Sequence, residues 1–287
     1  MQTIAMLGAG AMGARIAHNL LKAGYAVNVY NRTPERTATL VAAGATFAAT
    51  PHEAAAGADL VISMVRDDAA SRVVWLDAEQ GALRGMAAGS VGVECSTLTP
   101  GWVLELAAQV RATGVGFVEA PVLGTRPQAE AGQLIVLAGG EATDLARVEP
   151  ALRATAGALH HLGPVGSGAA MKLAVNTLYG VQVAVWAEML ALLERQGLPA
   201  EHTVALLNTL PTTSPALQAV GMLMMRGDYA PMFPIELVDK DFGYALELAR
   251  SLGATTPTLA AVRAIYAEAV ACGYGGDNIV GIRRLFS

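Results

Sequence analysis

The sequence predicts an α/β domain built on a doubly wound parallel sheet, followed by an all-α C-terminal domain. Up to about residue 160, short apolar runs alternate with helical stretches, a pattern typical of a parallel sheet covered by helices on both faces. After the turn-rich segment 162–168, only helical patterns follow. We therefore expect one domain at residues 1–163 and a second at residues 164–287.

The expected strands are almost wholly apolar, as is usual when both faces of a sheet are buried. They comprise residues 3–7, 26–30, 60–65, 91–95, 115–119 and 134–138. Between them we expect helices at residues 11–23, 34–43, 68–76 and 101–112. In the second domain, with prolines near several helix starts, the expected helices are 169–196, 200–208, 214–225, 235–251 and 258–271.

Composition excludes several classes of protein. With 53% hydrophobic and 15% charged residues in 287, the chain is not disordered, and its low charge suggests surface buried between subunits. A net charge of −5 argues against a nucleic-acid partner. Two cysteines cannot form a disulfide framework, no spacing suggests a metal site, and no leader pattern opens the chain. We expect a cytoplasmic protein that does not bind membranes, and interpret the apolar stretch 169–193 as a buried helix because polar residues interrupt it on different faces.

A glycine-rich loop follows the first expected strand and opens a helix. It reads Gly8-Ala9-Gly10-Ala11-Met12-Gly13. In this strand–loop–helix context, Gly8 allows the turn, Gly10 allows close approach of a pyrophosphate, and Gly13 lets the helix pack on the sheet. The helix amino terminus favours the anion. The loop predicts a dinucleotide site of the Rossmann type, the alternative being a tight strand–helix turn with no ligand.

The end of the second strand indicates which dinucleotide binds. An NAD site places an acid there for the ribose 2′-hydroxyl, but this chain has Tyr30-Asn31-Arg32-Thr33. Arg32 is placed to meet a 2′-phosphate, and Asn31 and Thr33 can donate to it. This favours NADP(H). The alternative is that Arg32 is a solvated surface charge.

The long helix that begins near residue 169 carries a candidate catalytic pair. Lys172 and Asn176 are four residues apart and share one face, which Gly180 extends with room for a bulky group. An ammonium in these apolar surroundings needs a partner or has a lowered pKa. Lys172 could protonate a carbonyl oxygen while hydride arrives at its carbon, and Asn176 would orient that oxygen or the lysine. The alternative is a lysine that snorkels near a helix end.

Four motifs, in order along nearly the whole chain, resemble those of the β-hydroxyacid dehydrogenases, the family of 3-hydroxyisobutyrate dehydrogenase and glyoxylate/succinic semialdehyde reductase. The first is the glycine-rich loop with its helix. The second, Glu94-Cys95-Ser96-Thr97-Leu98-Thr99-Pro100, resembles the D-x-S-T-x-x-P segment. The third, Glu119-Ala120-Pro121-Val122-Leu123-Gly124-Thr125, resembles the D-A-P-V-S-G-G loop. The fourth, Gly166-Ser167-Gly168 with Lys172-Leu173 and Asn176, resembles the G-x-G-x-x-x-K-L-x-x-N helix. A weaker fifth match is the Lys-Asp pair at residues 240–241.

The resemblance implies a Rossmann domain joined by a long interdomain helix to a helical domain that builds dimers or tetramers. It implies that Lys172 is the general acid/base, and that Asn176 and Lys240 act beside it. It places the substrate against Ser96, Thr97, Leu123, Gly124, Thr125 and Lys240, and adds Met64, Val65, Thr97 and Lys240 to the cofactor contacts. Imine reductases share this fold but usually lack the lysine, so Lys172 favours carbonyl and alcohol chemistry.

Within the family the segment 119–134 looks most like the glyoxylate/succinic semialdehyde reductase branch, with one departure. Leu123 stands where that loop usually has serine, so a hydroxyl that could bond a substrate carboxylate is lost, at a cost of about 1.5–3 kcal/mol. The backbone N–H groups of Gly124 and Thr125 and the Thr125 hydroxyl could compensate in part. The alternative is a 3-hydroxy acid or amino acid substrate in a more apolar pocket.

Two classes of function remain open. The first is an NADP(H)-dependent oxidoreductase acting on a small carbonyl or β-hydroxy acid. The second is a non-catalytic NADP(H)-binding module, which the altered loop at Leu123 favours. The presence of Lys172, Asn176 and the Ser-Thr pair favours the enzyme, because a binding module would not need them.

Overall fold

The computed structural model describes residues 2–286 and divides into two compact units, residues 1–172 and 173–287. The first unit is an α/β domain. Its sheet strands are β1 (Thr3–Leu7), β2 (Ala26–Tyr30), β3 (Thr46–Phe47), β4 (Leu60–Ser63), β5 (Val91–Glu94), β6 (Gly116–Glu119), β7 (Val122–Leu123), β8 (Leu134–Gly140) and β9 (Ala156–His161).

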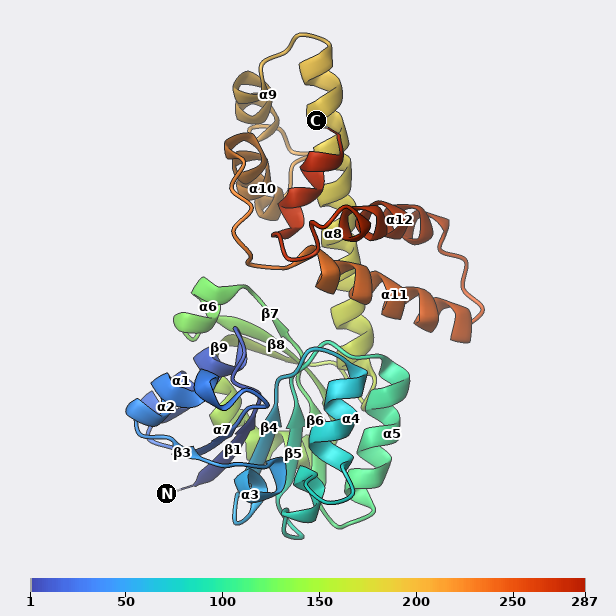
Figure 1. Ribbon diagram of the computed structural model, residues 1–287. Coiled ribbons are helices and arrows are strands. Elements are labelled where there is room, and N and C mark those ends of the chain that lie inside the picture. The colour runs from blue at the N-terminus through green and yellow to red at the C-terminus, as the bar shows by residue number, and fades with distance from the viewer. Residues whose placement is uncertain (1, 287) are drawn as a thin grey trace. The chain divides into compact units, whose positions relative to one another are not determined.

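The helices of this unit connect the strands. They are α1 (Gly13–Lys22), η1 (Pro34–Thr37), α2 (Ala38–Ala42), α3 (Pro51–Ala55), α4 (Asp68–Leu76), η2 (Ala82–Arg84), α5 (Pro100–Arg111), α6 (Arg126–Glu130) and α7 (Ala142–Arg153). Two separate apolar cores show that both faces of the sheet are covered (Figure 1). Ile4 and Met6 of β1 point into one core, and Ala5 and Leu7 point into the other. The predicted doubly wound sheet is confirmed.

The strand order is β3-β2-β1-β4-β5-β6-β8-β7, with β9 paired to β8. From β3 to β6 every pairing is parallel. The crossover from the β1–β2 side to β4 brings the carboxyl ends of β1 and β4 together, because Leu7 pairs with Ser63. This is the switch point where ligands bind in open α/β sheets.

The sheet is not parallel throughout. Strand β8 runs antiparallel to both β6 and β7, and then pairs in parallel with β9. The predicted parallel sheet is therefore extended by an antiparallel edge that the sequence did not indicate. The physical reason is the short connection: the loop between β7 and β8 holds only the single-turn helix α6, too little chain for a parallel crossover.

The second unit is helical. The long helix α8 (Ser167–Arg195) begins in the first unit and continues into the second, where α9 (Ala200–Leu207), α10 (Pro215–Arg226), α11 (Ile235–Ser251), α12 (Pro257–Ala271) and η3 (Ile279–Leu285) follow. Its core includes the fully buried rings of Phe242 and Tyr266, whose centroids lie 5.4 Å apart. The predicted all-α domain is confirmed.

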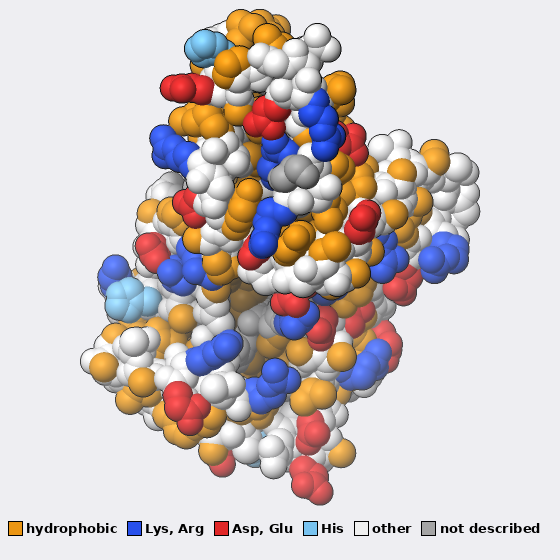
Figure 2. All heavy atoms as spheres, turned by 45° about the horizontal axis from the view of Figure 1, so that its top comes forward, with side chains coloured by type: hydrophobic (Ala, Val, Ile, Leu, Met, Phe, Trp, Pro, Cys, Tyr) orange, Lys and Arg blue, Asp and Glu red, His pale blue; other side chains and the backbone are white. Residues whose placement is uncertain are grey.

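Helix α8 is long and apolar enough, by length and composition, to cross a membrane. This is weak evidence, because buried helices of soluble proteins have the same length and composition. On the surface shown in Figure 2, acidic and basic side chains are interspersed without a broad field of one sign.

Candidate functional site

The glycine-rich loop connects β1 to α1, and each glycine in it has a different surrounding. Gly8 has φ +104°, and a Cβ there would lie 2.4 Å from the Met64 carbonyl oxygen. A Cβ on Gly13 would lie 2.0 Å from the Gly8 carbonyl oxygen. A Cβ on Gly10 would meet nothing within 4 Å. The fold itself therefore requires Gly8 and Gly13, whereas the space beside Gly10 is left for something other than the protein.

The first turn of α1 is suited to an anion. Its N-cap residue, Met12, has no side chain that could accept from the helix N–H groups, and no acid stands in the first turn. Ala11 is exposed, while Ala9 is buried and donates its N–H to Asn31. Helix N–H groups that point to open space bind phosphate groups well. The loop fits the pyrophosphate of a dinucleotide.

Asn31 braces this loop. Its Oδ1 accepts from the Ala9 N–H at 2.9 Å, and its Nδ2 donates to the Thr33 carbonyl oxygen at 2.8 Å. The sequence predicted Asn31 as a donor to a 2′-phosphate. In the structure its amide joins the glycine-rich loop to the turn after β2, a positioning role that no motif indicated.

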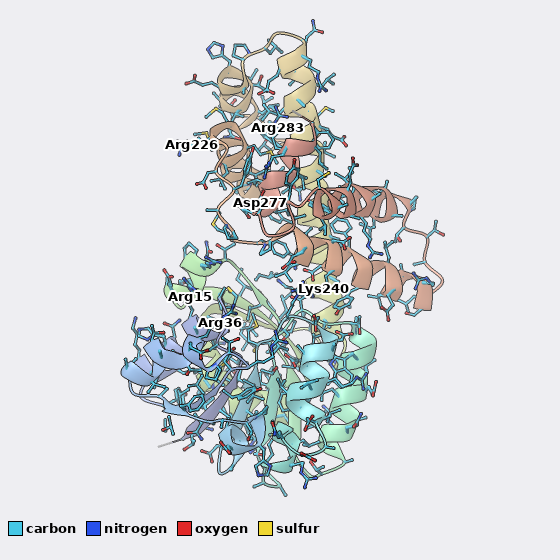
Figure 3. All side chains as sticks on the ribbon, in the orientation of Figure 1. Arg15, Arg36, Arg226, Lys240, Asp277 and Arg283 are labelled. Carbon is cyan, nitrogen blue, oxygen red and sulfur yellow. The ribbon has the colours of Figure 1, made fainter. Side chains whose placement is uncertain are left out.

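Two arginines are exposed after β2. Arg32 and Arg36 are both exposed, and within residues 2–286 neither side chain forms an ion pair or hydrogen bond. Arg36, in η1, is labelled in Figure 3. Sequence reasoning missed Arg36; its signal was a second arginine four residues after Arg32. Thr33 is exposed beside them. Both guanidinium groups are therefore exposed after β2 and have no ion-pair partner within residues 2–286.

The ends of β4 and β5 are joined through Ser96. Its hydroxyl accepts from the Val65 N–H at 2.7 Å, and only 3% of the residue is exposed. Glu94, fully buried, accepts from the Ser96 N–H at 2.9 Å and from Trp75 Nε1 at 2.8 Å. Burial raises the pKa of Glu94, and these hydrogen bonds oppose the rise. Ser96 thus holds the Met64–Val65 segment, while Thr97 is half-buried next to it.

Thr125, in the loop after β7, has both of its hydrogen-bond donors occupied. Thr125 donates both its N–H, at 3.0 Å, and its hydroxyl, at 2.7 Å, to Gln128 Oε1, forming a capping box at the start of α6. We expected these donors to compensate for the missing serine, but the structure assigns both to Gln128. Gly124 has φ +117° and is exposed, and Leu123 is half-exposed.

Lys172 lies near the start of α8 and is only 9% exposed. Its Nζ donates to the Val122 carbonyl oxygen at 2.7 Å. The sequence predicted that an ammonium here needs a partner, and this carbonyl is one. It comes from a residue 50 positions earlier in the chain, which is why no local pattern could identify it.

Asn176 lies one turn along α8, in the helical unit, and is tied to α11. Its Nδ2 donates to Asp241 Oδ2 at 2.6 Å. The other oxygen of Asp241 lies 2.9 Å from Lys240 Nζ, and Asp241 is 2% exposed. Lys240, labelled in Figure 3, also lies 4.5 Å from the ring centroid of Tyr244. Sequence reasoning quoted the Lys-Asp pair but gave Asp241 no role; here it links Asn176 to Lys240.

Gly180 of α8 was expected to leave room for a bulky group to approach, and the structure shows that this group is the Phe242 ring. A Cβ there would lie 2.5 Å from Phe242 Cε2, and Tyr266 donates its hydroxyl to the Gly180 carbonyl oxygen at 2.8 Å. The room is filled by the protein's own core, because α11 and α12 pack closely on this turn.

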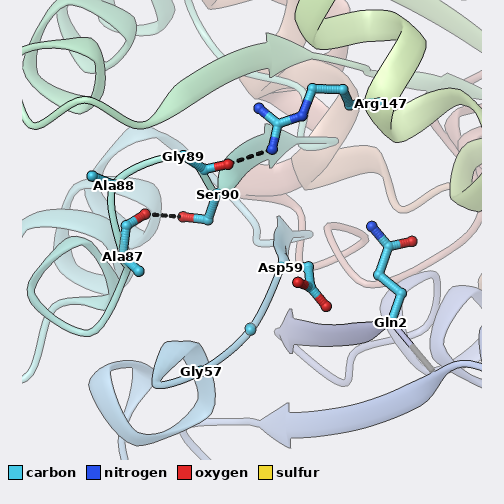
Figure 4. A pocket seen from close by; sticks show the side chains of 9 residues that line it. Gln2, Gly57, Asp59, Ala87, Ala88, Gly89, Ser90 and Arg147 are labelled. Carbon is cyan, nitrogen blue, oxygen red and sulfur yellow. Dashed lines mark hydrogen bonds between the residues drawn. The ribbon is translucent and has the colours of Figure 1, made fainter.

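A metal site and a separate pocket are two further candidates for a functional site. Among the described residues, no three His, Cys, Asp or Glu side chains gather in a way that could hold a metal ion. A pocket of about 300 Å³ is lined by residues such as Gln2, Asp59, Ser90 and Arg147 (Figure 4). These residues lie at or before the amino ends of β1, β4 and β5, or on α7. The pocket is therefore at the edge of the sheet opposite the glycine-rich loop.

Comparison with known protein families finds two matching models. Residues 3–163 match the NAD binding domain of 6-phosphogluconate dehydrogenase. Residues 166–286 match the NAD-binding model of NADP-dependent 3-hydroxyisobutyrate dehydrogenase. Together these models cover nearly all of the chain.

Individual proteins are similar over most or all of their length. The chain is 34% identical to glyoxylate/succinic semialdehyde reductase 2 of Arabidopsis thaliana, over 98% of this chain and 78% of that protein. It is 33% identical to an NAD-dependent L-serine dehydrogenase of Pseudomonas aeruginosa, over 100% of this chain and 98% of that protein. The crystal structure of a 3-hydroxyisobutyrate dehydrogenase from Salmonella typhimurium superposes with a TM-score of 0.90 at 27% identity, over 99% of this chain and 100% of that chain.

Proposed function

Because the chain belongs to the β-hydroxyacid dehydrogenase family of nicotinamide-dependent oxidoreductases, we propose that it transfers hydride between NADP(H) and a small carbonyl compound or β-hydroxy acid. The observation that carries this proposal is the buried Lys172 ammonium, held by the Val122 carbonyl oxygen at the start of α8. The bound nicotinamide supplies or accepts the hydride. The proton has to come from, or return to, the protein.

Lys172 is the proposed general acid/base. An ammonium has three N–H donors, and the bond to Val122 uses one of them while fixing the position of the nitrogen. In reduction, Lys172 donates a proton to the carbonyl oxygen as that oxygen becomes an alkoxide; in oxidation, it takes the hydroxyl proton. A lysine suits this exchange because its ammonium changes pKa readily when buried.

Asn176 is the proposed partner of Lys172. Four residues of helix place the two on one face. The bond from its Nδ2 to Asp241 determines which way the amide points, so Oδ1 is turned away from that carboxylate. That oxygen is an acceptor for the substrate hydroxyl or the lysine. Lys240, held by the same carboxylate, is the proposed contact for cofactor or substrate in the helical unit.

The residues after β1 and β2 fit NADP(H) better than NAD(H). The open space at Gly10 and the uncapped α1 fit a pyrophosphate. Among the described residues the positive side chains of Arg32 and Arg36 form no ion pair, and residues 31–33, directly after β2, include no acid for a ribose diol. We assign the remaining cofactor contacts to Gly8, Ala9, Ala11, Met12, Gly13, Asn31, Thr33, Met64, Val65 and Thr97.

The substrate is a small molecule, and we propose a short carbonyl compound. The Arabidopsis relative is a glyoxylate/succinic semialdehyde reductase, which suggests an aldehyde that bears a carboxylate. Ser96, Thr97, Leu123, Gly124 and Thr125 are the proposed contacts in the α/β unit. With Leu123 in place of a hydroxyl and both Thr125 donors given to Gln128, this loop favours a substrate with an apolar group beside Leu123. A 3-hydroxy acid with such a group is the second candidate.

We further propose that the chain forms a homodimer or homotetramer. One face of α8 in the helical unit carries Leu178, Val185, Met189 and Leu192, which are 40–63% exposed. Their spacing of seven, four and three residues makes a continuous apolar stripe, of the kind that second subunits cover. We also propose that residues 1–163 and 164–287 form the two domains. We propose a cytoplasmic location for the protein, which the exposed free thiol of Cys272 supports.

The test follows oxidation of NADPH and NADH with glyoxylate, succinic semialdehyde, methylmalonate semialdehyde and a bulky aromatic aldehyde. A preference for one of the short acids supports the reductase proposal, and activity only on the uncharged aldehyde shows that Leu123 makes the pocket apolar. Binding of NADPH without oxidation across the whole panel would favour the non-catalytic module instead.

A further inference from the structure

A second buried acid, Glu119, lies at the end of β6 and is joined to the start of α8. Only 1% of the residue is exposed. Its Oε1 accepts from the N–H groups of Gly166 at 2.6 Å and Gly168 at 2.8 Å, and its Oε2 accepts from the Ala169 N–H at 3.0 Å. All of these residues belong to the α/β unit. One carboxylate therefore satisfies three N–H groups at the beginning of the helix that carries Lys172.

The space around this carboxylate is made by glycines. A Cβ on Gly139 of β8 would lie 2.2 Å from Glu119 Oε1 and 2.8 Å from the Pro164 carbonyl oxygen. A Cβ on Gly168 would lie 2.4 Å from the Leu137 carbonyl oxygen and 3.2 Å from Glu119 Cδ. Neither position has room for a larger residue while Glu119 keeps its place. The site is thus shaped around a carboxylate of this length.

This contact is unlike an ordinary helix cap. A cap usually comes from a Ser, Thr, Asp or Asn next to the helix start. Glu119 instead comes from a sheet strand 47 to 50 residues earlier. Burial raises the pKa of Glu119, and its three N–H bonds oppose the rise. A local cap would satisfy the same N–H groups without burying an acid, so the contact achieves something more: it fixes the helix to β6.

The chain that follows Glu119 makes the second contact with α8. Three residues later, the Val122 carbonyl oxygen accepts from Lys172 Nζ. The segment 119–122 therefore holds α8 at two points, the backbone at the helix start and the nitrogen of the proposed proton donor one turn along it. If the first contact shifts, the second cannot keep its geometry.

We propose that Glu119 is a positioning residue for the reaction: through its three bonds to the start of α8, it sets where the Lys172 ammonium lies relative to the Val122 carbonyl. This inference rests on the proposed role of Lys172. It assigns Glu119 no contact with substrate or cofactor.

The direct test is Glu119→Gln, which keeps the size but replaces one acceptor oxygen with a donor that faces a backbone N–H. We expect kcat to fall about 10- to 100-fold, the usual cost of misplacing a catalytic group by about an ångström. The KM for NADPH should change less than twofold, because the glycine-rich loop is untouched. The alkaline limb of the kcat profile for reduction should move to lower pH, because an ammonium that loses the Val122 acceptor holds its proton less tightly.

Two further variants give independent evidence. Glu119→Asp keeps the charge and should recover part of kcat and of the wild-type pH profile. Gly139→Ala leaves Glu119 in place but pushes its carboxylate aside, and should repeat the effect of Glu119→Gln; it keeps the inference testable if the glutamine variant does not fold.

The matched control is Asp144→Asn. Asp144 of α7 also accepts from the backbone of β6, at the Phe117 N–H at 3.2 Å, and is bonded there rather than to α8. It should alter the melting temperature without moving the alkaline limb of kcat. If Glu119→Gln lowers the melting temperature but leaves kcat and its pH profile as in wild type, Glu119 is a structural residue and the inference fails. Wild-type turnover in Lys172→Ala would instead overturn the proposed function itself.

Discussion

Arginine readout of the 2′-phosphate is the prediction that most directly separates NADP(H) from NAD(H). We expect Arg32→Ala to lower kcat/KM for NADPH much more than for NADH. Arg32 is exposed and, among residues 2–286, forms no ion pair, so a phosphate would not have to break one. The same holds for Arg36, four residues along the chain.

The expected loss of kcat/KM for NADPH follows from the free energy that these contacts contribute. A hydrogen bond to a charged group contributes about 1.5–3 kcal/mol. Exposure to solvent favours the lower end of that range, and about 1.5 kcal/mol corresponds to roughly a tenfold loss. Arg32→Ala should therefore lower the NADPH/NADH ratio of kcat/KM about tenfold, and the double variant with Arg36→Ala about 100-fold if the two contributions are independent.

The assay is steady-state kinetics with both cofactors at fixed ionic strength, since exposed charge pairs are screened by salt. Arg226→Ala is the matched control, because Arg226 is an exposed arginine at the end of α10 (Figure 3). Equal losses with NADPH and NADH in Arg32→Ala would show that Arg32 supports the turn after β2 and does not read the phosphate.

Three other predictions concern specificity and stability. Leu123→Ser should raise kcat/KM for short carboxylate aldehydes about tenfold or more, since a bond to a charged acceptor contributes about 1.5–3 kcal/mol; unchanged preference across the aldehyde panel would place the carboxylate elsewhere. Gly180→Ala should lower the free energy of unfolding by about 1–3 kcal/mol, because the new methyl overlaps the fully buried Phe242 ring, and denaturant titration that shows no loss would refute the packing argument. The pKa of Glu94 is raised in the folded state, so its contribution to stability is present below the unfolded pKa of about 4.3 and is lost as pH rises through the folded value. Urea titrations of Glu94→Gln and wild type should therefore show the free energy of unfolding of the variant gaining on that of wild type as pH rises. A difference between the two that is independent of pH would contradict this.

Much of the fold follows from local pattern. The six expected strands and the five expected helices of the second domain lie where apolar runs and proline starts indicated, because each is long or bounded by strong turn signals. The elements that were missed are short or irregular. Strands β3 and β7 have two residues each, β9 ends in His160-His161, and α7 contains Pro150. Their structure depends on neighbours in the sheet rather than on their own composition.

The residues of the candidate site also divide into those that a local pattern predicts and those that depend on partners far away in the sequence. The steric requirement for Gly8 and Gly13 could be predicted from the sequence, and Lys172 could be proposed from it, because each depends on spacing within one loop or one helix. The roles of Asn31, Glu119 and Asp241 could not, because each acts through a partner 22 to 65 residues away. Thr125 shows the reverse case: its free donors were expected from the motif, and a local capping box with Gln128 engages them.

The most direct test of the central claim is hydride transfer by Lys172→Ala, with Lys22→Ala, an exposed lysine at the end of α1, as control. We expect Lys172→Ala to lower turnover of the best aldehyde by two or more orders of magnitude, in the range that general acid/base groups contribute, while NADPH fluorescence shows unchanged binding and Lys22→Ala remains fully active. Near-normal turnover by Lys172→Ala would contradict it, and the proton would then have to come from another group.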